Sequence, residues 1–270
     1  MTFGFSWLFW IPAGLSGLSE PAWPVVLLHY LGGLVPLLAA VGLITLRAPV
    51  QERRDYWRRA VDFRRIGLPW YAVILLAAPA LTGLAAVLDR LLGGSGGELE
   101  AAAGFIRQPL GILPFALFML LFGPLPEELA WRGFALDRFQ ARYPALLSSL
   151  LLGAAWTVWH LPLFFIQGSY QHSLGVGTPG FWLFLLDKVP QSILMTWFYN
   201  NNRRSILSAV LFHFSVNFSG ESFALSPRGE VFYILLWMAA AALVTLVWGP
   251  ARLSREERPA DQPAPLKAQG

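Results

Sequence analysis

Apolar runs of about the length that crosses a bilayer as a helix recur from one end of this sequence to the other. A soluble domain with a single membrane anchor would contain only one such run. Charged residues make up 13% of the 270 residues, which is about half of their share in a soluble domain. The sequence therefore predicts an all-α, polytopic protein that spans the membrane about eight times.

Eight segments are predicted to be helical. They lie near residues 3–18, 24–46, 69–92, 105–142, 146–166, 180–200, 204–220 and 230–249. The fourth is too long for one straight crossing, and we expect it to bend at Pro124 and Pro126. Residues 1–250 are predicted to form one membrane-embedded domain. Residues 251–270 are rich in Pro, Ala and charge, which predicts a disordered cytoplasmic tail.

The most basic loop lies between the second and third predicted helices. It contains Arg47, Arg53, Arg54, Arg58, Arg59, Arg64 and Arg65. The positive-inside rule places this loop in the cytoplasm, and both termini are then predicted to be cytoplasmic, in a cell membrane of the bacterial type. The same topology accounts for the net charge of +4, so membrane lipid, and not nucleic acid, is the expected partner.

One stretch of the fourth predicted helix brings two glutamates and an arginine into apolar surroundings. Pro124 and Pro126 cannot donate backbone hydrogen bonds, so the helix is expected to break there and to restart at Pro126. Glu127 and Glu128 then lie in the first turn, where the helix dipole favours negative charge. Arg132 follows Glu128 by four residues on the same face, which predicts an ion pair and leaves Glu127 unpaired.

Two later segments also carry polar groups that are costly in hydrocarbon. His160 precedes a proline in the fifth predicted helix, and His213 and Asn217 lie one turn apart in the seventh. Counting from the predicted helix ends puts these side chains and Glu127 about 14 to 20 Å into the membrane. The three segments are therefore expected to meet near its middle.

A glutamate, two histidines and an asparagine are suited to peptide hydrolysis. A carboxylate can take a proton from water, an imidazole can orient that water and later protonate a leaving amine, and His with Asn can stabilise an oxyanion. The same side chains, Glu127, His160 and His213, could instead bind a divalent metal such as Zn²⁺, whose bound water would be the nucleophile. Cysteine is absent, which excludes thiolate ligands and cysteine nucleophiles.

Each of these features also has a simpler structural explanation. The glutamates and Arg132 would form an ion-pair cluster at a membrane interface. His160 would be a packed histidine, and His213 with Asn217 would form hydrogen bonds between helices. The hydrolytic interpretation is preferred because three separate segments carry such groups at similar depth.

Asp187 and Lys188 form a further charged pair within the sixth predicted helix. Adjacent helical residues point about 100° apart, so each is expected to pair with a neighbouring helix. A transporter would use this pair and the glutamates as a coupling path, but the sequence shows no inverted repeat in support.

The order and spacing of the motifs resemble the three-motif signature of the CPBP family, the CAAX proteases and bacteriocin-processing proteases, which includes the type II CAAX prenyl endopeptidases. The motifs are Glu127-Glu128-x-x-x-Arg132, Trp156-x-x-x-His160 and His213-x-x-x-Asn217, all within residues 105–220. Trp156 departs conservatively from the phenylalanine that is common in the second motif. The resemblance implies an eight-helix fold whose active site lies inside the bilayer and opens toward the cytosol.

By motif position, the resemblance implies that Glu127 and His160 activate water. His213 and Asn217 would form an oxyanion hole or complete a metal site. Glu128 and Arg132 would support this arrangement.

The expected function is an intramembrane endopeptidase that cleaves a membrane-associated peptide or protein. The alternative is a non-catalytic membrane scaffold or immunity factor that binds a peptide in the same cavity. The sequence leaves open the metal dependence, the substrate and its prenylation, and the oligomeric state.

Overall fold

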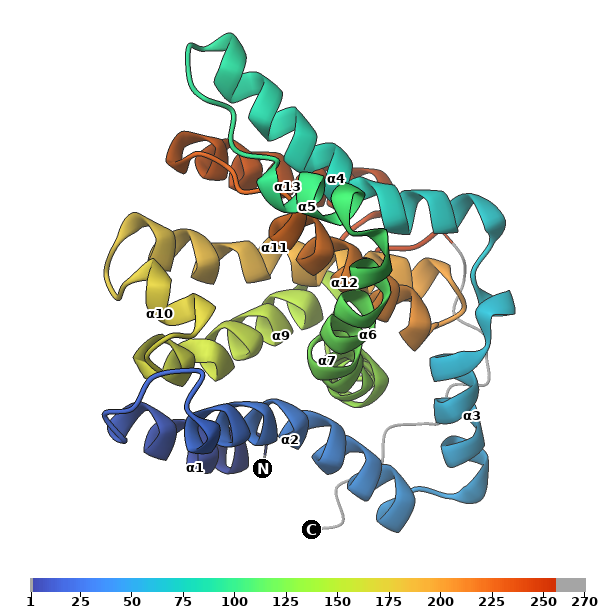
Figure 1. Cartoon of the computed structure of the whole chain (residues 1–270). Coiled ribbons are helices and arrows are strands. Elements are labelled where there is room, and N and C mark those ends of the chain that lie inside the picture. Colours follow the sequence, from blue (N-terminus) through green and yellow to red (C-terminus); the bar gives the residue numbers. More distant parts are fainter. Residues whose placement is uncertain (1, 256–270) are drawn as a thin grey trace.

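The computed structural model describes residues 2–255, and its regular structure is helical (Figure 1). The longer helices are α1 (Thr2–Leu15), α2 (Trp23–Arg47), α4 (Leu68–Leu91), α9 (Ala145–His160), α11 (Pro179–Asn201), α12 (Ile206–Ser222) and α13 (Pro227–Trp248). Within the described residues, the only pairing of extended backbone is an isolated β-bridge between Glu98 and Ala224. The predicted all-α fold is confirmed, and each of the eight predicted segments contains helix.

The fourth predicted segment is divided where its prolines occur. It consists of α6 (Ile112–Phe122), α7 (Pro124–Ala130), the π-helical η3 (Trp131–Ala135) and α8 (Leu136–Gln140). Gly123 separates α6 from α7 with φ −125° and ψ −94°. The expected restart at Pro126 is wrong by two residues, because the helix begins at Pro124. Both prolines fit the first turn, where backbone N–H groups have no acceptor within the helix.

Shorter helices connect the long ones. They are α3 (Val50–Val61), η1 (Phe63–Arg65), α5 (Glu100–Arg107), η2 (Pro109–Gly111), η4 (Leu161–Phe165) and α10 (Tyr170–Leu174). The basic loop of the sequence analysis is therefore largely helical. Arginine is a good helix former, and α3 contains four arginines.

Within residues 2–255, five helical segments are long and apolar enough to cross a membrane. They are Trp23–Arg47, Leu68–Leu91, Pro109–Gln140, Ala145–Phe165 and Pro227–Trp248. This confirms a polytopic membrane protein, whereas the eight crossings and the side on which the termini lie stay predictions. Two of the remaining helices, α1 with 14 residues and α12 with 17, are shorter than a typical crossing.

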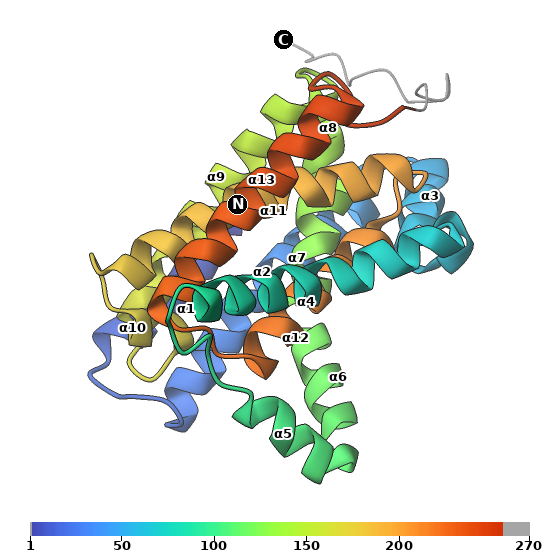
Figure 2. The same cartoon turned by 90° about the horizontal axis from the view of Figure 1, so that it is seen from above.

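The helix with the two glutamates, α7, packs against α2 and α12 inside the bundle. Around it, α11 packs along α9 and α13, and α12 packs along α4 (Figures 1 and 2). By contrast, α5 and α6 extend from the bundle (Figure 2). Leu113, Leu117 and Phe118 of α6 are 66%, 47% and 45% exposed. Such an apolar outer surface is suited to contact with lipid.

The chain returns to the bundle after α13. The carbonyls of Pro250 and Ala251 accept backbone hydrogen bonds from Leu146 and Ala145 of α9, and Leu253 is fully buried. The remainder of the predicted disordered tail, residues 256–270, lies outside the described residues.

Gly32 allows α1 and α2 to approach closely. A Cβ at Gly32 would lie 2.2 Å from Nε1 of Trp10, whereas one at Gly33 would have no such neighbour within 4 Å. We expect Gly32→Ala to lose about 1 to 3 kcal/mol of stability through overpacking. Gly33→Ala should lose none, because alanine is the better helix former. Thermal unfolding in detergent measures both, and equal melting temperatures would contradict this packing.

Candidate active site

The adjacent glutamates of α7 lie in the interior of the bundle. Glu127 is 8% exposed and Glu128 is fully buried. His160 at the end of α9 and His213 on α12 are buried as well. Charged and polar groups that are far apart in sequence therefore share one interior region, where each needs a partner.

Glu128 binds two partners at once. Its Oε2 lies 3.0 Å from Nη1 of the fully buried Arg132, so the ion pair expected from their spacing is present. Its Oε1 lies 2.9 Å from Nδ1 of His213. Because an ionised carboxylate only accepts hydrogen bonds, Nδ1 of His213 carries the hydrogen. This orientation leaves Nε2 of His213 available to another group.

Arg132 connects α7 and η3 to two further helices. Its Nη2 donates to Oγ of Ser192 on α11 at 3.2 Å, and that hydroxyl donates to the Ser149 carbonyl of α9 at 2.9 Å. The guanidinium carbon also lies 5.4 Å from the ring centroid of Trp156, a cation–π distance. Ser192 could not be predicted from the sequence, because a lone serine in an apolar helix is not distinctive.

Trp156 connects Glu127 to His160. Its indole Nε1 donates to Oε2 of Glu127 at 2.5 Å. Its backbone carbonyl lies 2.8 Å from Nδ1 of His160. A carbonyl only accepts, so this Nδ1 also carries its hydrogen, and Nε2 of the neutral ring keeps a free lone pair. The motif position alone indicated Trp156, although its i, i+4 relation to His160 also predicts that the two side chains share a face.

The indole of Trp156 also borders the second histidine. Its ring centroid lies 5.1 Å from that of His213, edge to face, and 5.7 Å from that of His160. Asn217 lies one turn after His213 on α12 and is partly buried. Its Nδ2 would be 3.5 Å from a Cβ at Gly123, so the amide lies beside the break between α6 and α7. All the predicted site residues are thus grouped around Trp156 and this break.

Lys188 of α11 brings a further cation to the same region. Its Nζ lies 5.2 Å from the ring centroid of Trp156 and 4.1 Å from that of Phe184. The expectation that Asp187 and Lys188 pair with other helices is wrong, because Nζ lies 3.2 Å from Oδ2 of Asp187 itself. The long lysine side chain can bend back to its neighbour, and Gln191 donates to the other oxygen of Asp187.

The expected metal ligands are Glu127, His160 and His213. Both histidines use Nδ1 within the protein, so each offers only Nε2. Within residues 2–255, no three His, Asp or Glu side chains are spaced to bind one metal ion together. The described side chains therefore do not match a metal site as they are arranged.

Comparison with known proteins extends the resemblance beyond the three motifs. Residues 109–219 match the family model described as type II CAAX prenyl endopeptidase Rce1-like, and this range contains all the predicted site residues. The chain is also 31% identical over 246 residues to CAAX prenyl protease 2 of Methanococcus maripaludis, and the match covers 90% of each chain.

The ion pair between Glu128 and Arg132 yields a stability test. Arg132→Met leaves a buried carboxylate without its main counter-charge, which is expected to cost about 3 to 5 kcal/mol. Adding Glu128→Gln removes that carboxylate, so the double variant should regain most of the lost stability. Chemical denaturation of the wild type, both single variants and the double variant gives the coupling. A double variant less stable than Arg132→Met would contradict this pairing.

Proposed function

Because the chain belongs to the Rce1-like type II CAAX prenyl endopeptidase family, we propose that it hydrolyses a peptide bond of a membrane-associated substrate through Glu127 and His160. The relative from M. maripaludis is named a CAAX prenyl protease. We extend that substrate class, a prenylated CAAX peptide or protein, to this chain. The observation that carries the proposed mechanism is the link from Glu127 through Trp156 to His160.

In the proposed first step, Glu127 accepts a proton from water as the water oxygen bonds to the substrate carbonyl carbon. Trp156 occupies Oε2 of this carboxylate, which leaves Oε1 for the water. His160 orients the same water through Nε2, because its Nδ1 is engaged with the Trp156 carbonyl. The C–N bond then breaks, and the leaving amine receives the proton through the imidazole.

His213 and Asn217 are proposed to stabilise the oxyanion that forms in this step. A donor at Nε2 of His213 requires the doubly protonated ring, since Nδ1 already carries a hydrogen toward Glu128. The Asn217 amide supplies a second donor. Hydrogen bonds and charges of this kind stabilise a transition state more strongly in a buried site than in water.

A substrate held in the membrane would approach through the lipid. α6 leads directly into the break before α7, and its exposed surface is apolar. Tyr30 of α2 lies edge to face with Phe118 and Phe122 of α6, at centroid distances of 5.5 and 5.2 Å. We propose that the lipid-facing side of α6 borders the path by which substrate reaches Glu127.

The role of Glu127 is tested by Glu127→Gln, which keeps the shape of the side chain and removes its basicity. We expect the rate of cleavage of a prenylated CAAX peptide in proteoliposomes to fall about 100-fold or more. Glu221→Gln, at an exposed position of α12, is the matched control and should retain full activity. A Glu127→Gln variant that cleaves at the wild-type rate, with unchanged thermal unfolding, would overturn this mechanism. If the wild-type protein binds the peptide but does not cleave it, the non-catalytic scaffold is favoured.

Metal dependence can be tested separately. If the protein used a metal, Glu127, His160 and His213 would be its ligands. The proposed steps involve no metal, since these side chains do not form a three-ligand group as arranged. The expected result is full activity after chelation and less than one bound metal ion per chain by elemental analysis. Loss of activity on chelation, with recovery on addition of Zn²⁺, would contradict the proposed metal-free route.

A further inference from the structure

α3 connects two segments that can cross a membrane, since α2 ends at Arg47 and α4 begins at Leu68. A connection between successive crossings lies at a membrane surface. In both views α3 lies at the edge of the bundle (Figures 1 and 2). Its inward face contacts the protein and its outward face does not.

The outward face of α3 carries an apolar stripe. Val50, Trp57 and Val61 are separated by seven and four residues, which places them in one line along the helix. They are 52%, 42% and 69% exposed. A helix face that contacts only water is not expected to align a tryptophan and two valines. The stripe therefore indicates a partner with an apolar part.

Arginines border this stripe on both sides. At 100° per residue, Arg53 flanks one side, and Arg54 and Arg58 flank the other. The three arginines, Val50, Trp57 and Val61 line a shallow surface hollow. Arg54 and Arg58 are exposed. Neither takes part in an ion pair within residues 2–255.

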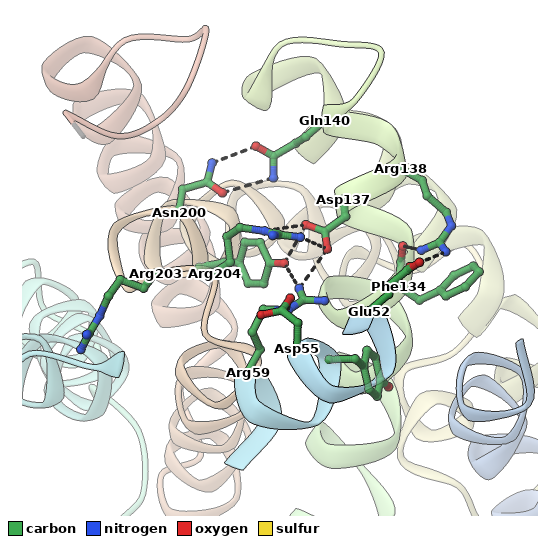
Figure 3. A network of polar contacts seen from close by, with 12 residues as sticks. Glu52, Asp55, Arg59, Phe134, Asp137, Arg138, Gln140, Asn200, Arg203 and Arg204 are labelled. Carbon is green, nitrogen blue, oxygen red and sulfur yellow. Dashed lines mark hydrogen bonds and ion pairs between the residues drawn. The ribbon is translucent and has the colours of Figure 1, made fainter. Parts of the chain in front are cut away.

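The acidic residues of α3 do not neutralise these arginines. Glu52 lies 3.5 Å from Nη2 of Arg138 on α8, and Asp55 lies 2.8 Å from Nε of the buried Arg59 (Figure 3). Both carboxylates are therefore engaged with other cations. The outward face keeps a positive charge beside an apolar stripe.

We propose that this face of α3 binds the anionic headgroups of phospholipids in the adjoining leaflet. The arginines contact lipid phosphates, and Trp57 with the two valines enters the boundary between headgroups and acyl chains. Helices with an apolar stripe between basic flanks bind anionic membranes in this way. The proposal concerns a lipid surface outside the active site and goes beyond the proposed peptidase activity.

The inward face of α3 contacts the helices of the candidate active site. Tyr56, which is fully buried, donates to the Leu129 carbonyl of α7 at 2.9 Å. Burial raises the pKa of Tyr56, so the hydroxyl keeps its proton and continues to donate. Arg59 lies 2.9 Å from Asp137 of α8, which also pairs with Arg204 (Figure 3). Lipid that restrains the outward face therefore also restrains a helix bound to α7.

A single cysteine can report on this surface, because the sequence has none of its own. Val61→Cys carries an environment-sensitive fluorophore, and the full chain is reconstituted into vesicles of phosphatidylcholine with increasing phosphatidylglycerol. The expected result is a blue shift that grows with the anionic fraction and is reversed by high salt, which screens exposed charges. Val50→Cys repeats the measurement at the other end of the stripe.

Two charge variants decide what causes the response. Arg54→Gln/Arg58→Gln should move the response to a higher anionic fraction, because each arginine removed lowers the affinity for an anionic surface about fivefold. Arg142→Gln/Arg252→Gln removes the same charge from exposed positions away from α3 and should leave the response unchanged. No response to anionic lipid at either label, or equal loss in both variants, would overturn the proposal. The fluorescence requires no catalysis, so an inactive protein would count against the proposed peptidase alone.

Discussion

The arrangement of the site depends on the contacts of the buried Glu128 carboxylate with Arg132 and His213. In a membrane interior an isolated charge is costly, and two partners on different elements compensate this one. Arg132 also reaches Ser192 on α11, and His213 belongs to α12. Desolvation offsets much of the attraction in a buried pair, so its main effect here is on position and not on net stability. The helices that carry the site are thereby fixed relative to one another.

Glu127 is adjacent in sequence, yet its surroundings differ. It has the indole of Trp156 as a neutral donor, whereas Glu128 has the guanidinium of Arg132 and the imidazole of His213. Both oxygens of Glu128 thus have partners, whereas Glu127 keeps Oε1 for the proposed reaction. The helix break makes this difference possible, because Gly123 and the prolines after it start a new helix whose first turn brings both glutamates into the bundle. Trp156 then joins the carboxylate to His160 through its side chain and its own carbonyl.

The sequence predicted most of the fold, because apolar periodicity and length determine where helices form in a membrane. It also predicted the pairing of Glu128 with Arg132, which depends only on helical spacing. It did not predict the role of Ser192, the indole contact of Trp156 or the pairing of Lys188 with its neighbour. The first two depend on how helices distant in sequence are rotated against one another, and the third depends on the side-chain conformation of the lysine, neither of which local patterns encode. The helix in the basic loop was missed because its charges were interpreted as topology alone.

We propose that Glu127 and His160 share one water molecule in a buried site organised by Glu128. The most direct measurement is an experimental structure of the protein in lipid, at a resolution that locates ordered water. We expect a water within hydrogen-bonding distance of both the free oxygen of Glu127 and Nε2 of His160. A structure in which the Glu127 carboxylate lies too far from both imidazoles to share a water, with or without bound substrate, would contradict it.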